Sequence, residues 1–216
     1  MVRVALLAIA AVAADPYEVV DRVVAVVDDD PILLSDVRRG LAIGLIGDGG
    51  AVAGTPGRAA LDRLIEYRLR LHEVERADVE IAEDAVTGQV ERVLARWPQR
   101  EAALSELGLD RDELRALVRR QLEVLRYVEE RLGARVYVTL EDVRRHYEDV
   151  AVPQWRGAGV EVPELEDVRE EIRAVLRAER LNEEVAAWTE RLRRQADVID
   201  LLAAETELLP VRRTRE

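Results

Sequence analysis

Cysteine, lysine and phenylalanine are all absent from this 216-residue sequence. Without cysteine there is no disulfide, no thiolate nucleophile and no cysteine-ligated metal site. Without lysine the glycine-rich stretch at 47–57 cannot end as a phosphate-binding loop does, in Lys-Ser or Lys-Thr. These absences exclude thiol redox chemistry and give no support to nucleotide binding, so we expect no cofactor.

Histidine is also scarce, and no catalytic or metal-binding motif contains it. His72 and His146 both lie on predicted helices without a partner motif, where a lone histidine is usually structural or solvated. The acidic triplet at 28–30 lacks the spaced ligands, central glycine and closing glutamate of a calcium loop, so we read it as a solvated turn without a metal. Carboxylates are too abundant for any to be singled out as acid or base. We therefore expect no catalytic residue, with an enzyme of unrecognised type as an outlying alternative.

The charge of the chain limits its partners. Thirty-two basic residues, all arginine, stand against 44 acidic ones, which gives a formal charge of −12. Such a chain repels nucleic-acid phosphates and anionic lipid head groups. The longest apolar run, Val4 to Val12, is much shorter than the roughly 20 residues that a spanning helix needs. We expect neither nucleic-acid binding nor stable membrane insertion.

Residues 1–14 have the features of a secretory signal peptide. Met1-Val2-Arg3 forms a charged start, the apolar run follows, and Ala11-Val12-Ala13 is a small-residue cleavage site. The alternative is a buried strand or helix at the start of a cytosolic protein. The pattern favours export, with removal of the segment.

The beginning of the mature chain favours strands. Residues 19–27 are rich in β-branched side chains, 28–31 form a polar turn that ends in proline, and 32–34 make a short second strand. Ser35 is suited to cap a helix that runs to about Ile46.

The remainder of the chain is predominantly helical in pattern. The expected elements are a glycine-rich loop over 47–57, helices over 58–72, 82–97 and a short stretch before 108, a long helix over 110–132, a helix over 139–149, an irregular connector over 151–163, a closing helix over 163–194, and a strand over 198–202. Asp110 with Glu113 has the spacing of a capping box, and Thr139 is a second cap. The closing helix has an inward stripe that includes Val175 and Trp188. The sequence predicts a mostly α fold with a small β-sheet formed by the N-terminal strands and a C-terminal strand.

The order of these elements resembles that of SurA-like periplasmic chaperones. Residues 20–37, Val-Asp-Arg-Val-Val-Ala-Val-Val-Asp-Asp-Asp-Pro-Ile-Leu-Leu-Ser-Asp-Val, resemble the strand-turn-strand-helix with which that family begins. The helix start at 109–114, the lead-in at 138–143 and the long closing helix with its final strand follow the same plan. The resemblance covers nearly the whole mature chain.

This resemblance implies a domain organisation and a function. The implied parts are a helical chaperone domain over 15–150, a connector over 151–163, a closing helix and strand over 164–202 that pack back on the chaperone domain, and a flexible tail over 203–216. In the family, parvulin-type prolyl isomerase domains stand where this chain has its thirteen-residue connector. A compact domain needs at least about 50 residues. The implied activity is therefore the holding of unfolded outer-membrane or other envelope proteins in the periplasm, without isomerisation.

Five apolar side chains are candidates for contact with such clients. Leu41, Leu45 and Ile46 lie on the first helix, Trp97 ends a helix before a proline, and Trp155 lies in the connector. An indole at a helix end can face a groove, but local packing explains each tryptophan equally well, and the three aliphatic residues can simply cover the core. The functional alternative is a dedicated structural or assembly partner of one envelope protein, which a test with several unrelated peptides would separate from a general chaperone.

We predict that the mature chain begins near Asp15, after cleavage behind Ala13 or Ala14. Amino-terminal sequencing of protein recovered from an exporting cell checks this. An intact Met1 on the recovered protein would contradict export through this segment.

Overall fold

The computed structural model describes residues 21–47 and 57–202. The predicted signal peptide, most of the glycine-rich loop and the predicted tail lie outside these residues. The elements in chain order are β1 (Val23–Val27), β2 (Asp30–Leu33), α1 (Leu34–Ile43), α2 (Arg58–Glu75), α3 (Glu83–Leu94), α4 (Arg100–Glu106), α5 (Arg111–Arg131), a 3-10 turn η1 (Gly133–Arg135), α6 (Leu140–His146), a π-helical turn η2 (Tyr147–Ala151), α7 (Val152–Gly157), α8 (Leu165–Gln195) and β3 (Val198–Asp200).

The three strands form one antiparallel sheet in the order β2-β1-β3. The central strand β1 pairs with β3 through Val27 opposite Val198 and Ala25 opposite Asp200. Val24, Ala25 and Val27 are fully buried and belong to the same core cluster as the buried residues of α2. Because a hairpin alone is only marginally stable, the return of a third strand and the helical cover make this sheet possible. The predicted pairing of the first and last strands is confirmed.

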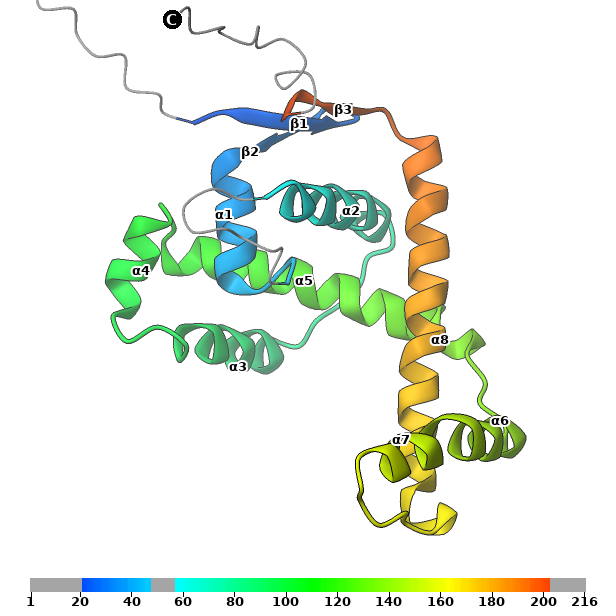
Figure 1. Cartoon of the computed structure of the whole chain (residues 1–216). Helices are drawn as coiled ribbons and strands as arrows, with labels where there is room; N and C mark the ends of the chain where they lie inside the picture. The colour runs from blue at the N-terminus through cyan, green and yellow to red at the C-terminus, as the bar shows by residue number, and fades with distance from the viewer. Residues whose placement is uncertain (1–20, 48–56, 203–216) are drawn as a thin grey trace, which may run out of the picture.

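The helices form a body beneath the sheet and a smaller unit at the far end of α8 (Figure 1). In the body, α2 packs against β1, α1, α5 and α8, and α5 packs against both α2 and α3. One core cluster joins the sheet, α2 and the C-terminal half of α8. A second cluster joins α3, α4 and the N-terminal half of α5. Helix α5 has buried residues in both clusters, Val124 in the first and Leu114 and Val118 in the second, and therefore links the two halves of the body.

The closing helix α8 is 31 residues long and contacts two separate cores. Near the sheet, Trp188 stacks on Tyr127 of α5 with ring centroids 5.5 Å apart. At the other end Ile172 packs with Val143 of α6 in a third cluster, which defines the satellite module of α6, η2, α7 and the start of α8. The prediction that Val175 points inward is wrong, because it is 44% exposed and belongs to neither of the core clusters that α8 contacts.

Two further local predictions are wrong: that of Ser35 as the cap of the first helix, and that of a wholly irregular connector over 151–163. Helix α1 begins at Leu34 with Leu33 as its cap residue, because Ser35 is held by Asp21 instead. It ends at Ile43, where Gly44 takes up a left-handed conformation with φ of 77°. The segment 151–163 is not wholly irregular, since residues 152–157 form α7. Proline at the first turn of a helix loses no hydrogen bond, so Pro153 permits this turn.

The predicted caps of α5 and α6 are both confirmed. Asp110 accepts a hydrogen bond from the Glu113 backbone N–H at 2.8 Å, and Glu113 accepts one from the Asp110 N–H at the same distance. Thr139 and Asp142 make the corresponding pair at the start of α6. Arg180 of α8 also forms an ion pair with Asp142 at 3.0 Å, so this cap fastens the satellite module to α8.

We predict a pH-dependent contribution from Asp142. Hydrogen bonds from the Thr139 backbone and hydroxyl, and then from Arg180, lower the pKa of Asp142 from 3.8 to about 2. A carboxyl with a lowered folded-state pKa stabilises the fold above its unfolded pKa and loses that effect as the pH falls toward the folded value. Asp142→Asn should therefore increase amide exchange in α6 at pH 7, and the difference from wild type should vanish between about pH 4 and pH 2. Glu148→Gln, an exposed carboxylate of the same module, is the control, and an equal effect there would contradict the assignment.

Candidate functional site

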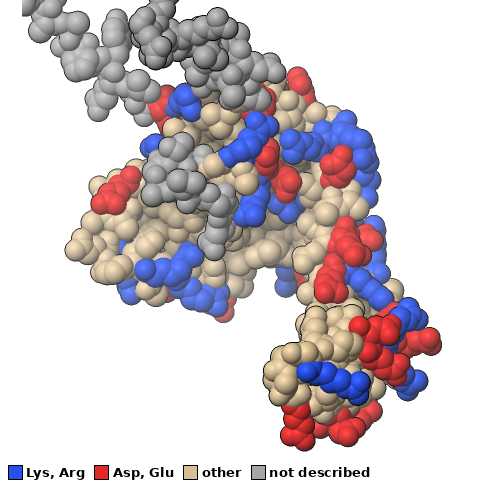
Figure 2. Space-filling model, viewed as in Figure 1, with Lys and Arg blue, Asp and Glu red and all other residues tan. Residues whose placement is uncertain are grey.

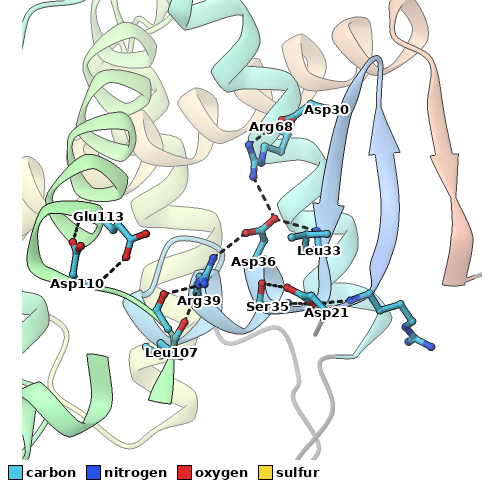
Figure 3. A network of polar contacts seen from close by, with 12 residues as sticks. Asp21, Asp30, Leu33, Ser35, Asp36, Arg39, Arg68, Leu107, Asp110 and Glu113 are labelled. Carbon is cyan, nitrogen blue, oxygen red and sulfur yellow. Dashed lines mark hydrogen bonds and ion pairs between the residues drawn. The ribbon is translucent and has the colours of Figure 1, made fainter. Parts of the chain in front are cut away.

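A network of charged groups positions helix α1 against the rest of the body (Figure 3). Asp36 accepts a hydrogen bond from the Leu33 backbone N–H at 3.0 Å, which satisfies one of the free donors at the start of the helix. The same carboxylate lies 3.6 Å from a guanidinium nitrogen of Arg39 and 3.6 Å from one of Arg68 on α2. One side chain thus caps α1 and attaches it to α2.

The acidic turn between the first two strands belongs to this network. Asp30 accepts a hydrogen bond from Arg68 at 2.9 Å and lies 3.5 Å from His72. Asp28 has a φ of 55° and exchanges two hydrogen bonds with Asp197 just before β3, at 2.7 and 3.0 Å. Asp28 and Asp29 are exposed in a turn, as predicted, but Asp28 and Asp30 in addition have partners from distant parts of the chain. Within residues 21–47 and 57–202, no group of three or more acidic or histidine side chains is placed to hold a metal ion.

A second arginine ties α1 to the turn between α4 and α5. Arg39 donates from Nε to the Leu107 carbonyl at 2.9 Å and from Nη2 to the Gly108 carbonyl at 3.0 Å. Carbonyl oxygens at the end of α4 have no partner within that helix, so a guanidinium there satisfies them. Helices α1, α2 and α5 are thus fixed relative to one another by polar contacts outside the apolar cores.

Between these three helices lies a cavity of about 270 Å³. It opens to solvent and is lined by residues of both core clusters of the body. Its lining is Asp36, Arg39, Gly40, Ile43 and Leu45 from α1 and the residues after it, Leu64, Tyr67, Arg68 and Leu71 from α2, and Leu109, Glu113, Ala116, Leu117 and Arg120 from α5 and the turn before it. We call it the α1–α2–α5 cavity.

The lining of the cavity is apolar inside and charged around it. Ile43, Leu64 and Leu71 are buried aliphatic side chains, while Glu113 and Arg120 are exposed on α5. This combination of an apolar surface with a few polar groups is typical of ligand-binding cavities, whose volumes run from about 300 to 1,000 Å³. The α1–α2–α5 cavity lies just below this range and has room for one or two apolar side chains of a ligand.

Tyr67 is the unusual polar group of the cavity. Its side chain is only 6% exposed, and its hydroxyl oxygen has no hydrogen-bond partner among the described residues. Burial raises the pKa of Tyr67 to about 12, although the positive charges of Arg68 and Arg120 act in the opposite direction. The hydroxyl is therefore a neutral donor at physiological pH.

The three candidate residues predicted on the first helix differ from one another in burial. Leu41 and Leu45 are half-buried and pack against the body's core, and Leu45 also lines the cavity. Ile46 is 6% exposed and belongs to the core itself, next to Gly40. This burial contradicts the expectation that Ile46 offers a surface to clients. The chain turns back after Gly44, so the Ile46 side chain packs against Gly40 of α1.

The two candidate tryptophans lie apart from the cavity and from each other. Trp97 is half-buried against the second core cluster and lines a shallow pocket with Pro98 and α4. Trp155 is half-buried in the satellite module, where its ring meets Tyr147 edge-on at 6.0 Å. Both tryptophans therefore make local packing contacts, which was the alternative to a role in facing a groove.

Sequence reasoning missed Tyr67 and most of the cavity. Leu64, Tyr67, Arg68 and Leu71 follow one face of α2, for which the sequence predicted only a helix over 58–72. A tyrosine within an otherwise aliphatic stripe was the available signal, since a buried phenol normally has a hydrogen-bond partner.

Charges of both signs are interspersed over α8 and the satellite module, and a recess separates that module from the body (Figure 2). Among the helices that the structure describes, none has the length and apolar character needed to cross a bilayer.

These features define a helical body, completed by a strand from the end of the chain, that contains a small apolar cavity. No protein-family model matches the chain. It is similar to "Chaperone SurA" from Pseudomonas fluorescens (strain Pf0-1), with 29% identity over 134 residues, covering 58% of this chain and 32% of that protein. It is also similar to "Chaperone SurA" from Pseudomonas syringae pv. tomato (strain ATCC BAA-871 / DC3000), with 30% identity over 133 residues, 57% of this chain and 31% of that protein.

The chain thus spans about a third of the length of the curated relatives it matches. The similarity supports a SurA-like relationship over the matched region. It agrees with the family to which the opening strand-turn-strand-helix was compared.

We predict that Asp36→Ala lowers the free energy of unfolding by about 1 to 3 kcal/mol. The substitution removes the hydrogen bond to the Leu33 N–H at the start of α1 and leaves the partly buried Arg39 and Arg68 without their shared carboxylate. Urea unfolding followed by circular dichroism measures this change in free energy. Asp29→Ala, an exposed aspartate of the neighbouring turn, should change stability by less than about 0.5 kcal/mol. Equal losses for the two variants would contradict the role given to Asp36.

Proposed function

We propose that this chain is a chaperone that holds unfolded polypeptide segments, with the α1–α2–α5 cavity as a contact site for their apolar side chains. The observation that carries the proposal is this open cavity, with aliphatic side chains inside it and charged side chains around it. The similarity to proteins named Chaperone SurA supports the same function. The proposed clients are outer-membrane or other envelope proteins, met in the periplasm after export of the chain.

The size of the cavity suits weak and reversible binding. A site for one or two side chains cannot enclose a folded client, but it can engage successive apolar residues of an extended one. A dissociation constant near ~1 μM corresponds to about −8 kcal/mol, which allows release by mass action without a nucleotide. The three helices are attached to one another by Asp36, Arg39 and Arg68, so the cavity is preformed and little ordering is required on binding.

We further propose that holding occurs without prolyl isomerisation. In SurA-like chaperones a parvulin-type domain stands where this chain has residues 151–163. Here that stretch consists of the short helix α7 and a link into α8. A compact domain of about 50 residues or more does not fit into it. The short helix packs through Trp155 into the satellite module instead.

We predict that the purified protein slows aggregation of several unrelated unfolded β-barrel clients and leaves the cis-to-trans rate of a prolyl peptide unchanged. Light scattering of diluted client and a coupled prolyl-isomerase assay on the same preparation measure the two properties. Absence of protection at stoichiometric excess would overturn the holding function, and isomerase turnover would overturn its non-catalytic form. Protection of a single client alone would favour a dedicated assembly partner.

The contribution of the cavity is tested by filling it. Ala116 is exposed on α5 and lines the cavity, so Ala116→Phe should place a ring inside it without disturbing a core position. Protection should weaken by about fivefold or more in the concentration required, with the free energy of unfolding within about 1 kcal/mol of wild type. Ala187→Phe, at an exposed alanine on α8, is the matched control and should protect as wild type does. Equal protection by both variants would place client contact elsewhere on the chain.

A further inference from the structure

The charged side chains that line the α1–α2–α5 cavity differ in whether the fold already uses them. The lining has three arginines and two carboxylates, so it is net positive in a chain whose formal charge is −12. Arg39 donates to two backbone carbonyls, and Arg68 binds Asp30 and Asp36 (Figure 3). The third arginine, Arg120, is exposed on α5, and its guanidinium forms no ion pair or hydrogen bond within residues 21–47 and 57–202. It is therefore the free cation of the lining.

The two carboxylates of the lining leave the charge of Arg120 uncompensated. Asp36 is shared between the two other arginines, and Glu113 accepts a hydrogen bond from the Asp110 N–H at the start of α5. Glu113 and Arg120 are two turns apart on α5, which is about 10 Å along the helix axis. Exposed charges interact weakly beyond a Debye length, about 8 Å at physiological ionic strength. The Arg120 end of the cavity is thus locally positive.

The free charge lies next to apolar lining. Ala116 is one turn before Arg120 on α5 and lines the same cavity, so the two side chains are neighbours on one face of the helix. A ligand side chain that enters the cavity therefore brings the adjoining part of the ligand close to a guanidinium. This group has five N–H donors in a planar fork that matches the two oxygens of a carboxylate. The chemical complement of the site is an apolar side chain with a carboxylate beside it.

Resting on the proposed holding function, we propose that Arg120 selects client segments with an acidic residue two positions from the apolar residue that enters the cavity. In an extended chain, residues i and i+2 point to the same side and lie about 7 Å apart, so both can face α5 at once. An exposed charge pair changes affinity only a few-fold. Arg120 therefore sets a preference among clients, and segments without the acidic residue still bind.

The charge of the whole chain makes this preference distinctive. A formal charge of −12 repels acidic ligands and attracts basic ones at long range. A preference for an acidic peptide over a neutral one therefore has to arise from a local positive group. Substitution of that group alone should remove it.

Fluorescence anisotropy with two labelled peptides, blocked at both ends, tests the proposal. Gly-Glu-Ser-Phe-Ser-Glu-Gly has a glutamate at both second neighbours of phenylalanine, so it offers a carboxylate to Arg120 in either chain direction. Gly-Gln-Ser-Phe-Ser-Gln-Gly is its neutral counterpart. In about 0.15 M salt we expect wild type to bind the glutamate peptide about 2- to 5-fold more tightly than the glutamine peptide. In about 1 M salt, where the Debye length is about 3 Å, the two affinities should converge.

Three variants locate the preference on the chain. Arg120→Gln should bind the two peptides equally or favour the glutamine peptide, and Arg120→Lys should keep the wild-type preference. Arg144→Gln is the matched control, because Arg144 is exposed on α6, does not line the cavity and forms no ion pair with the described residues. It changes the charge of the chain by the same amount and should keep the preference. A ratio of two affinities is unchanged by a substitution that merely destabilises the fold.

The outcomes separate the role of Arg120 from the holding function. Wild type that binds the glutamate peptide no more tightly than the glutamine peptide would overturn the role of Arg120, as would a preference that persists in Arg120→Gln. Either result, with clients still protected by wild type and less so by Ala116→Phe, leaves the holding function in place. Failure of wild type to protect any client would instead overturn the holding function.

Discussion

The pairing of β1 with strands on both of its edges is the interaction on which the rest of the structure depends. On one edge it pairs with β2, only a few residues away, and on the other with β3, which follows the long helix α8. Asp28 strengthens the second pairing through two hydrogen bonds to Asp197. Since β3 is fixed to β1, the direction of α8 is set along the body, and with it the position of the satellite module at its far end (Figure 1).

The acidic residues of the opening strands and α1 transmit this arrangement to the cavity. Asp30 and Asp36 both bind Arg68, which lies on the cavity-lining face of α2. The turn of the sheet and the start of α1 therefore hold the same helix that carries Tyr67. A segment that has the sequence of a polar turn thus supports the helices that line the α1–α2–α5 cavity, and this gives a physical reason for the combination of aspartate and serine residues near 21–36.

Features encoded within a few consecutive residues were predictable from the sequence, whereas of the features that depend on distant contacts only the pairing of the first and last strands was predicted. The Asp110 and Thr139 caps were predicted because each is complete within four residues. The third strand was predicted because a hairpin alone is too weak. Ser35 was assigned as a cap because its true partner, Asp21, lies 14 residues away. The cavity was missed because three helices are needed to form it, and only Leu45 of the five candidate residues lines it.

The antiparallel partner that completes β1 is synthesised long after β1 itself. Asp28 and Asp197, which link the two strands, are 169 residues apart. At about 5 to 20 residues per second, ribosomal synthesis separates them by roughly 10 to 30 s. During that interval one edge of β1 has free N–H and C=O groups, which are available to any other extended chain. The nascent protein is itself an unfinished sheet for this time, and it requires protection from the same kind of mispairing that a chaperone prevents in its clients.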